Sequence, residues 1–210
     1  MRSGWKERRV TAAVAPILLA LASCAGLGAT AKPSTEQQPT PKNFVQQAVQ
    51  QLLANQAAGR VRTISGVGYV MAPIAVFLAN GEISLLPSTP DLESELALLH
   101  RRWEAGRRQP LPFEAFQAAF TRLTAQREAV GQAGGETLVR FAETDKKGRF
   151  RFEAVPEGRW ILVADMSSPV STLLWAVPIQ VGPNDPPPLP LIDSTLLLEA
   201  RKTERDFPTR

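Results

Sequence analysis

The sequence predicts a mainly β protein, a β-sandwich with an α-helical hairpin inserted between two of its strands. Two observations carry this prediction. The run 144–164, TDKKGRFRFEAVPEGRWILVA, alternates polar and apolar side chains on both sides of a Pro-x-Gly turn, which is the period of β-strands. Residues 90–131 instead repeat their apolar residues three and four positions apart, which is the period of helices.

The chain begins with the pattern of an export signal. Basic residues between Arg2 and Arg9 precede an apolar run from Val10 to Ala22, which is too short to span a bilayer comfortably. A basic segment, a short apolar core and small residues together make a secretory signal peptide. We therefore expect residues 1–23 to be removed from the mature chain.

The signal ends in Leu21-Ala22-Ser23-Cys24, which resembles the lipobox of bacterial lipoproteins. In that family the peptide is cut before the cysteine, whose thiol receives a diacylglycerol and whose new amine is acylated. The resemblance implies lipidation of Cys24, so that the membrane is a partner through this lipid. A plain signal peptide that contains a cysteine is the alternative. Because Cys24 is the only cysteine, a disulfide within the chain is impossible.

Ala25 follows the cysteine. In Gram-negative lipoproteins an Asp at this place commonly signals retention in the inner membrane. The resemblance therefore implies the bacterial cell envelope as the location, and the outer membrane if the source has one.

The charge of the chain argues against nucleic acid as a partner. The whole sequence has 24 basic and 20 acidic residues, and four of the basic and one of the acidic lie in residues 1–23. The mature chain keeps 20 basic and 19 acidic residues, so the high isoelectric point belongs largely to the leader. Binding to nucleic acid through a basic surface loses its main support.

The mature chain opens with a linker and a helix. Residues 24–42 are rich in Ala, Gly, Pro, Thr, Ser and Gln, a composition typical of a flexible tether. Residues 43–58 space Phe44, Val49 and Leu52 at helical intervals and predict a short amphipathic helix.

Residues 59–200 are enough for one domain with its own core. Segments with the strand pattern or the strand composition recur between turn signals, and Pro-rich residues 183–190 form a stiff, extended connector. The expected strands are Val61–Thr63, Tyr69–Leu78, Thr137–Glu143, Arg149–Glu153, Arg159–Asp165, 173–181 and Ser194–Glu199. Residues 201–210 form a charged tail.

The inserted hairpin is expected from Pro90 to Gly131. Thr89 is placed to cap the first helix, and Pro90 suits its first position. The apolar stripe of this helix is Leu92, Leu96, Leu99 and Trp103, and that of the second helix is Phe113, Phe116, Phe120, Leu123 and Val130.

A set of residues around the turns carries a family resemblance: Thr144, Asp145, Gly148, Phe150, Phe152, Pro156, Gly158 and Trp160. They resemble the carboxypeptidase regulatory-like domains, which implies a transthyretin-like Greek-key β-sandwich. We interpret the run as a structural β-hairpin that turns Phe150 and Phe152 into the core; a ligand-binding hairpin is the alternative.

The segment LLWAVPIQV, 173–181, is apolar on both faces, since Trp175 and Val177 alternate with Leu174 and Ala176. A strand of this kind needs cover on both sides. We expect the inserted helices on its outer face; an oligomer or partner surface there is the alternative. Pro178 lacks an N–H, which places it at an edge or a bulge.

Residues for catalysis are sparse. His100 is the only histidine, and no Cys or His pair has zinc spacing and no acidic loop has calcium spacing. We expect no catalytic residue, metal or cofactor. The arginines Arg101, Arg102, Arg107 and Arg108 close the first inserted helix, where cations offset the helix dipole. The alternative is contact with anionic headgroups, lipopolysaccharide phosphates or an acidic partner.

The function expected from these features is a lipid-anchored, non-enzymatic envelope scaffold or binding protein with a protein or glycan partner. The alternative is a carbohydrate-binding module, which needs an exposed aromatic platform; Trp103 and Trp160 are the candidates. A hydrolase would require His100 to meet a buried serine and an acid.

Overall fold

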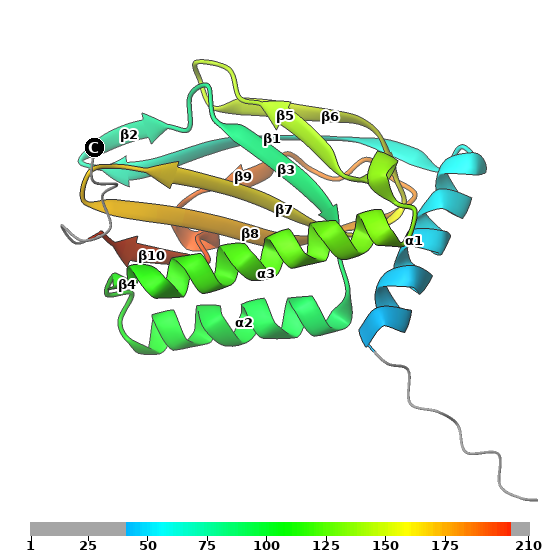
Figure 1. Ribbon diagram of the computed structural model, residues 1–210. Coiled ribbons are helices and arrows are strands. Elements are labelled where there is room, and N and C mark those ends of the chain that lie inside the picture. Colours follow the sequence, from blue (N-terminus) through cyan, green and yellow to red (C-terminus); the bar gives the residue numbers. More distant parts are fainter. Residues whose placement is uncertain (1–40, 203–210) are drawn as a thin grey trace, which may run out of the picture. The chain divides into compact units, whose positions relative to one another are not determined.

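The computed structural model describes residues 41–202 (Figure 1). The leader, Cys24 and residues 25–40 of the expected tether lie outside the described residues, as does the tail from 203. The described part confirms the predicted fold class, because two β-sheets face each other and a pair of helices is inserted between two strands. No helix in residues 41–202 is both long and apolar enough to cross a membrane.

The smaller sheet has the strand order β2-β1-β6, and β9 pairs with β1 in parallel. The larger sheet has six strands in the order β4-β10-β8-β7-β3-β5. The strands of the smaller sheet are β1 (Val61–Ala72), β2 (Ile74–Phe77), β6 (Arg149–Pro156) and β9 (Leu189–Leu191). Those of the larger sheet are β3 (Glu82–Pro87), β4 (Leu111–Pro112), β5 (Arg140–Glu143), β7 (Gly158–Ser167), β8 (Ser171–Val181) and β10 (Leu198–Arg201).

Within residues 41–202, three α-helices and two short 3-10 helices complete the fold: α1 (Pro41–Ala57), α2 (Pro90–Ala105), α3 (Phe113–Gln132), η1 (Glu136–Leu138) and η2 (Asp193–Thr195). The hairpin of α2 and α3 lies in the chain between β3 and β5. Helix α2 begins as expected, because the Thr89 side chain accepts the N–H of Leu92 at 3.4 Å and Pro90 follows. Helix α1 packs against the body through buried Val49 and Leu52.

The inserted helices lie on the outer face of the larger sheet, as the pattern of 173–181 predicts (Figure 1). The outward side chains Leu174 and Ala176 are buried, and so are the inward ones such as Trp175. Strand β10 pairs with residues 171–174 of β8 only. Pro178 therefore lies where β8 has β7 on one side and no strand on the other, which suits its missing N–H.

The expected β-hairpin in 144–164 is wrong in its pairing. Phe150 and Phe152 are buried as predicted, but β6 pairs with β1, whereas β7 pairs with β3 and β8. The turn at Pro156–Gly158 therefore carries the chain from one sheet to the other. The reason is that alternation specifies which side chains face the core and leaves the partner strand open.

Other details also differ from the sequence prediction. The expected strand Tyr69–Leu78 is broken at Pro73 into the antiparallel pair β1 and β2, and η1 occupies the start of the expected strand Thr137–Glu143. Strand β3 was not expected, because its SLLP segment directly precedes the helix cap. Phe120 is 44% exposed, so it lies outside the buried face of α3. Ala119 is buried beside it, whereas Leu123 and Val130 are buried as predicted. The last strand starts at Leu198 rather than Ser194, since η2 occupies 193–195.

The core position of Trp160 predicts a large loss of stability on truncation. Its ring is fully buried, and its Nε1 donates to the Pro156 carbonyl at 2.9 Å. Trp160→Ala should lower the free energy of unfolding by about 3–5 kcal/mol, measured by urea denaturation. The control Phe120→Ala, on a half-exposed ring, should cost about 1 kcal/mol or less. Equal losses in the two variants would contradict this assignment of the core.

Candidate functional site

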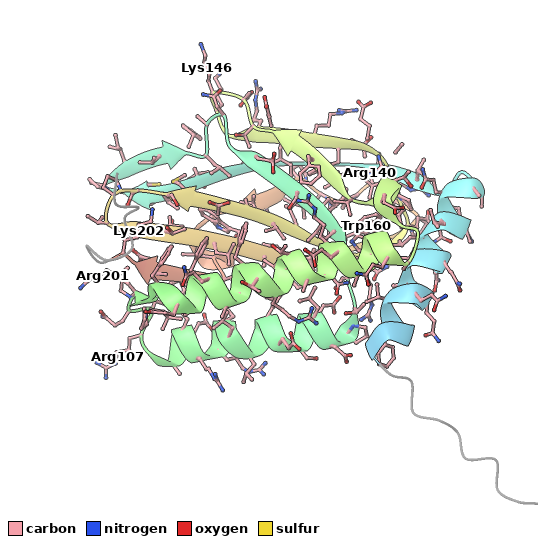
Figure 2. The ribbon with its side chains drawn as sticks, in the orientation of Figure 1. Arg107, Arg140, Lys146, Trp160, Arg201 and Lys202 are labelled. Carbon is pink, nitrogen blue, oxygen red and sulfur yellow. The ribbon has the colours of Figure 1, made fainter. Side chains whose placement is uncertain are left out.

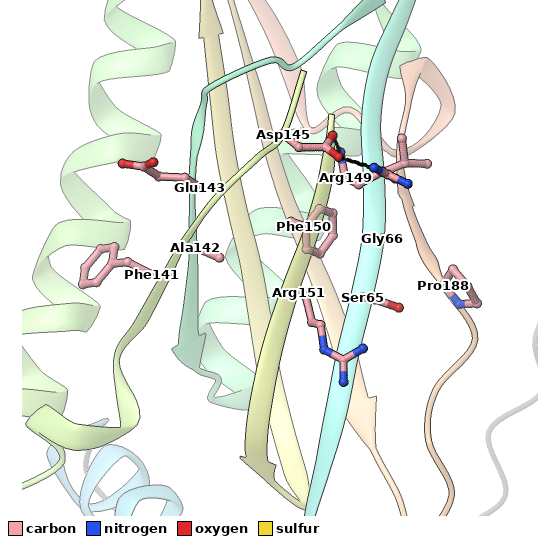
Figure 3. A pocket seen from close by; sticks show the side chains of 11 residues that line it. Ser65, Gly66, Phe141, Ala142, Glu143, Asp145, Arg149, Phe150, Arg151 and Pro188 are labelled. Atoms are coloured by element: carbon pink, nitrogen blue, oxygen red, sulfur yellow. Dashed lines mark hydrogen bonds and ion pairs between the residues drawn. The ribbon is translucent and has the colours of Figure 1, made fainter. Parts of the chain in front are cut away.

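A groove of about 790 Å³ opens along the side of the sandwich between β5 and β6 (Figure 3). Residues of both sheets line it, since β5 is an edge of the larger sheet and β6 is an edge of the smaller one. Its lining residues are Ser65, Gly66, Val67, Phe141, Ala142, Glu143, Asp145, Arg149, Phe150, Arg151 and Pro188. We call it the β5–β6 groove.

One end of the β5–β6 groove is closed by the turn that joins its two strands. The Asp145 carboxylate accepts the backbone N–H groups of Lys147 at 2.8 Å and Arg149 at 2.9 Å. It also pairs with the Arg149 guanidinium at 2.6 Å. Gly148 has a φ of 69°, the left-handed region that glycine adopts without strain. These contacts fix the turn from which β5 and β6 diverge.

The other end is closed by the side chain of Arg140. Its guanidinium donates to the carbonyls of Glu153 at 2.8 Å and Ala154 at 3.0 Å, and Ala154 has a φ of 53°. Burial lowers the pKa of Arg140, and its Nε is buried with no hydrogen-bond partner among the described residues. One side chain thus joins two strands that share no backbone ladder.

Between these closed ends, both strands turn backbone groups into the groove. Thr144 exchanges backbone hydrogen bonds with Asn80 and Gly81 on the β3 side. Because neighbouring residues of a strand direct their N–H and C=O groups to opposite edges, Phe141 and Glu143 direct theirs away from β3. On β6, the Arg149 carbonyl accepts the Asp145 N–H, so Arg151 faces the same way. Within residues 41–202, no strand pairs with these edges.

The side chains around the groove add one aromatic ring and several charges. In Figure 3 the side chains of Phe141 and Glu143 project from β5 away from β6, so β5 offers the groove mainly its backbone edge. Phe141 is 48% exposed, and the Arg127 guanidinium lies 5.3 Å from the centre of its ring. Arg151 pairs with Glu153 at 3.0 Å at the surface. The groove therefore presents backbone edges flanked by one exposed aromatic ring and by charged side chains.

The arginines expected as an anion site do not converge on one point. All four are exposed. Arg108 pairs with Glu104 at 2.9 Å and lies 5.5 Å from the centre of the Trp103 ring. Its hydrogen bond, together with the nearby His100, lowers the pKa of Glu104. Arg101 lines a separate depression with Glu93 and Arg159, whereas Arg102 and Arg107 make no ion pair within the described residues.

The two tryptophans named as a glycan platform cannot serve as one. Trp103 is 2% exposed and Trp160 is fully buried, so neither ring offers an open face to a sugar. This part of the carbohydrate prediction is wrong. Among the residues that line the groove, Phe141 has the one exposed aromatic ring, and the strand pattern of residues 137–143 does not mark it as functional.

His100 lacks the neighbours of a hydrolase. Its Nε2 lies 3.5 Å from the Glu104 carboxylate, and its Nδ1 lies 3.4 Å from the Leu197 carbonyl. No serine is hydrogen-bonded to it among residues 41–202. The same part of the chain holds no group of three His, Cys, Asp or Glu side chains arranged for a metal ion.

The residues that carry the family resemblance make hydrogen bonds and packing contacts within the fold. Thr144 is buried; its hydroxyl accepts the N–H of Gly81 at 2.8 Å and donates to the Leu78 carbonyl. Gly158 has a φ of 145°, and a Cβ there would lie 2.5 Å from the Leu52 side chain of α1. Of this set, Asp145 and Phe150 also line the groove. Cys24 lies outside the described residues.

Comparisons with known proteins show little close similarity. No protein-family model matches the chain, and no curated protein matches it. Among solved structures, a candidate carbohydrate-binding protein from Pseudomonas aeruginosa aligns with a TM-score of 0.37 and 18% identity, over 63% of this chain and 88% of that chain. The pilus backbone protein of Streptococcus pneumoniae aligns with a TM-score of 0.27 and 13% identity, over 58% of this chain and 35% of that chain. Neither likeness is close enough to bear on what this chain binds.

The contacts of Asp145 predict an acid-sensitive turn. Hydrogen bonds from the Arg149 backbone and side chain lower the pKa of Asp145 from 3.8 to about 2. Because the folded pKa is depressed, the ionised carboxylate stabilises the fold above about pH 4, and this stabilisation is lost as the pH falls through about 2. Asp145→Asn should therefore be less stable than the wild type at pH 5, and the difference should vanish near pH 2.

Urea denaturation from pH 5 to pH 2 measures this difference. Lys146→Ala, at a neighbouring exposed turn residue (Figure 2), is the matched control and should keep the wild-type pH dependence. A gap between wild type and Asp145→Asn that stays constant down to pH 2 would contradict the depressed pKa.

Proposed function

We propose that the mature chain is a lipid-anchored, non-enzymatic binding module of the bacterial cell envelope, and that it takes an extended segment of a partner protein in the β5–β6 groove. Anchorage is supported by the lipobox resemblance at Leu21–Cys24 and by the absence of any other cysteine in the sequence. If the source has an outer membrane, Ala25 favours that membrane through the same resemblance.

The observation that carries the binding proposal is the pair of facing strand edges. Phe141 and Glu143 on β5 and Arg151 on β6 present N–H and C=O groups that no strand of the described residues satisfies. The natural complement of such an edge is the backbone of an extended peptide, which adds as a further strand. The main chain then supplies affinity, and the neighbouring side chains supply selectivity.

The charges near the groove favour a peptide with polar side chains. Asp145 and Arg149 neutralise each other at the closed end, and Arg151 and Glu153 do so further along β6. Glu143 has no ion-pair partner within residues 41–202. A basic side chain of the incoming segment would find its complement at this carboxylate.

A second candidate function is carbohydrate binding, which the exposed ring of Phe141 favours. A sugar ring stacks on an open aromatic face and uses nearby charged groups for its hydroxyls. Glu143, two residues along the same strand, projects on the same side as Phe141 (Figure 3). In this version the ligand lies on the outer side of β5 rather than against its backbone edge.

The anchor proposal predicts a change of location. Cys24→Ala removes the only thiol, so the protein should move from the membrane fraction to the soluble fraction of cells. Mass spectrometry of the native protein should show acyl groups on an N-terminal Cys24. Continued membrane retention of the variant, or a free thiol on an uncut N-terminus, would overturn the anchor.

The strand-addition proposal predicts a backbone effect at Glu143. Glu143→Pro removes an N–H that points into the groove and leaves the ladder to β3 intact, whereas Glu143→Ala removes only the carboxylate. A photo-reactive phenylalanine analogue at position 141 should crosslink a protein in cells. Its yield should fall more than tenfold with Glu143→Pro, and severalfold at most with Glu143→Ala.

The same analogue at position 98, an exposed leucine of α2, is the control and should give no such adduct. An adduct that resists protease and shifts with glycan-degrading enzymes would favour the carbohydrate function. Equal yields in the proline and alanine variants would exclude backbone recognition.

A further inference from the structure

The β1–β2 hairpin exposes an apolar surface that the body of the protein does not cover. Residues 69–78, YVMAPIAVFL, contain no charged residue, and all four residues of β2 are exposed. Met71 is 61% exposed and Ile74 is 73% exposed, on either side of the tight turn at Pro73. A contiguous apolar surface of this kind marks a site of contact with a membrane or another protein.

Cations gather at the same end of the sandwich. The β1–β2 turn, the β7–β8 turn and the end of β10 lie together at the left of Figure 1, with α1 at the opposite end. Figure 2 labels Arg107, Arg201 and Lys202 at this end. Lys202 is held on the β7–β8 turn, where its Nζ donates to the Ser168 carbonyl at 3.0 Å and its N–H donates to the Val170 carbonyl at 3.0 Å.

Three nearby acids are already engaged. Burial and the neighbouring Glu82 raise the pKa of Asp165, and the charge of the nearby Lys202 acts against this rise. Asp193 accepts the N–H of Met71 at 3.0 Å at the base of the hairpin, and Glu104 pairs with Arg108. Val170 adds a second exposed apolar tip, at 70% exposure. We call the surface made of Met71, Pro73, Ile74, Val170, Arg107, Arg201 and Lys202 the end face.

We infer that the end face rests on a lipid bilayer that carries anionic headgroups. The apolar tips would enter the boundary between headgroups and acyl chains, and the cations would meet lipid phosphates. Charge complementarity favours an anionic bilayer over a second copy of the chain, because two end faces would bring Arg201 and Lys202 against each other.

The length of the linker permits this orientation. Residues 24–40 number 17 and span at most about 60 Å when fully extended. The 12 residues of β1 run for about 40 Å along the sandwich. A body tethered beside α1 can therefore turn its far end to the membrane that holds it. This orientation toward the anchoring membrane depends on the proposed lipid anchor. The affinity of the end face for anionic lipids does not, because it is a property of the folded body.

Vesicle binding by a protein without the lipid anchor on Cys24 tests the inference. The probe is the mature chain from residue 24 with Cys24→Ser, mixed with vesicles of equal parts phosphatidylglycerol and phosphatidylcholine or of phosphatidylcholine alone, and separated by flotation. The chain should float with the anionic vesicles. Met71→Asp with Ile74→Asp should weaken binding more than tenfold, and Arg201→Ala with Lys202→Ala severalfold.

Matched controls lie away from the end face. Leu98→Asp changes an exposed leucine of α2, and Lys146→Ala changes a cation at the β5–β6 turn (Figure 2); both should bind like the parent chain. Thermal unfolding confirms that each variant folds. No flotation of the parent, or flotation unchanged by the hairpin variant, would overturn the inference.

Self-association that the hairpin variant abolishes, without vesicle binding, would assign the end face to a second copy and also overturn it. Because the probe carries no acyl chain, these results stand apart from the fate of Cys24. A failed anchor would show in cell fractionation and mass spectrometry alone.

Discussion

The rest of the structure depends on the burial of both faces of the central strands β7 and β8. Five consecutive residues of β7, Trp160 to Ala164, are buried, although successive side chains of a strand point to opposite sides. The smaller sheet can cover only one of these sides. Helices α2 and α3 cover the other, and each large side chain so buried contributes roughly 1.5–3 kcal/mol relative to exposure. The inserted helices are thus an integral layer of the core, because without them the outer face of β7 and β8 would be exposed to water.

The sequence contains enough information to predict the elements and their buried sides, but less about their partners. Helix α2 was predictable in detail, because Thr89 and Pro90 mark its start and Leu92, Leu96 and Trp103 lie on one face. The cover over Leu174 and Ala176 followed from a strand that is apolar on both sides. The sheet assignments of β6 and β7 did not follow, since alternating residues look the same whether the next strand pairs or crosses to the other sheet.

The candidate site was hidden from the sequence for a related reason. The groove lies between two strand edges, so the groups that it offers are backbone N–H and C=O groups. Every residue except proline has both groups, so the residue types at Phe141 and Glu143 do not reveal the site. Only the divergence of β5 and β6 after the Asp145 turn exposes these groups. The arginines that the sequence suggested as an anion site, Arg101, Arg102, Arg107 and Arg108, are instead spread around the end of α2. The exposed hairpin was visible as an uncharged run, yet the same run would suit a buried strand.

The strands that flank the insertion suggest how it can vary. Leu85 of β3 pairs with Arg140 of β5, so the chain leaves and re-enters the sheet at adjacent positions. Antiparallel neighbours joined in this way tolerate almost any connecting length, because lengthening a closed loop changes its entropy only slowly. The helical pair can therefore change in length or be exchanged for another cover while β3 and β5 keep their register, provided that the replacement is apolar on the side that meets the sheet. The pairing that such an exchange would remove is that of the short β4, between the two helices, with β10.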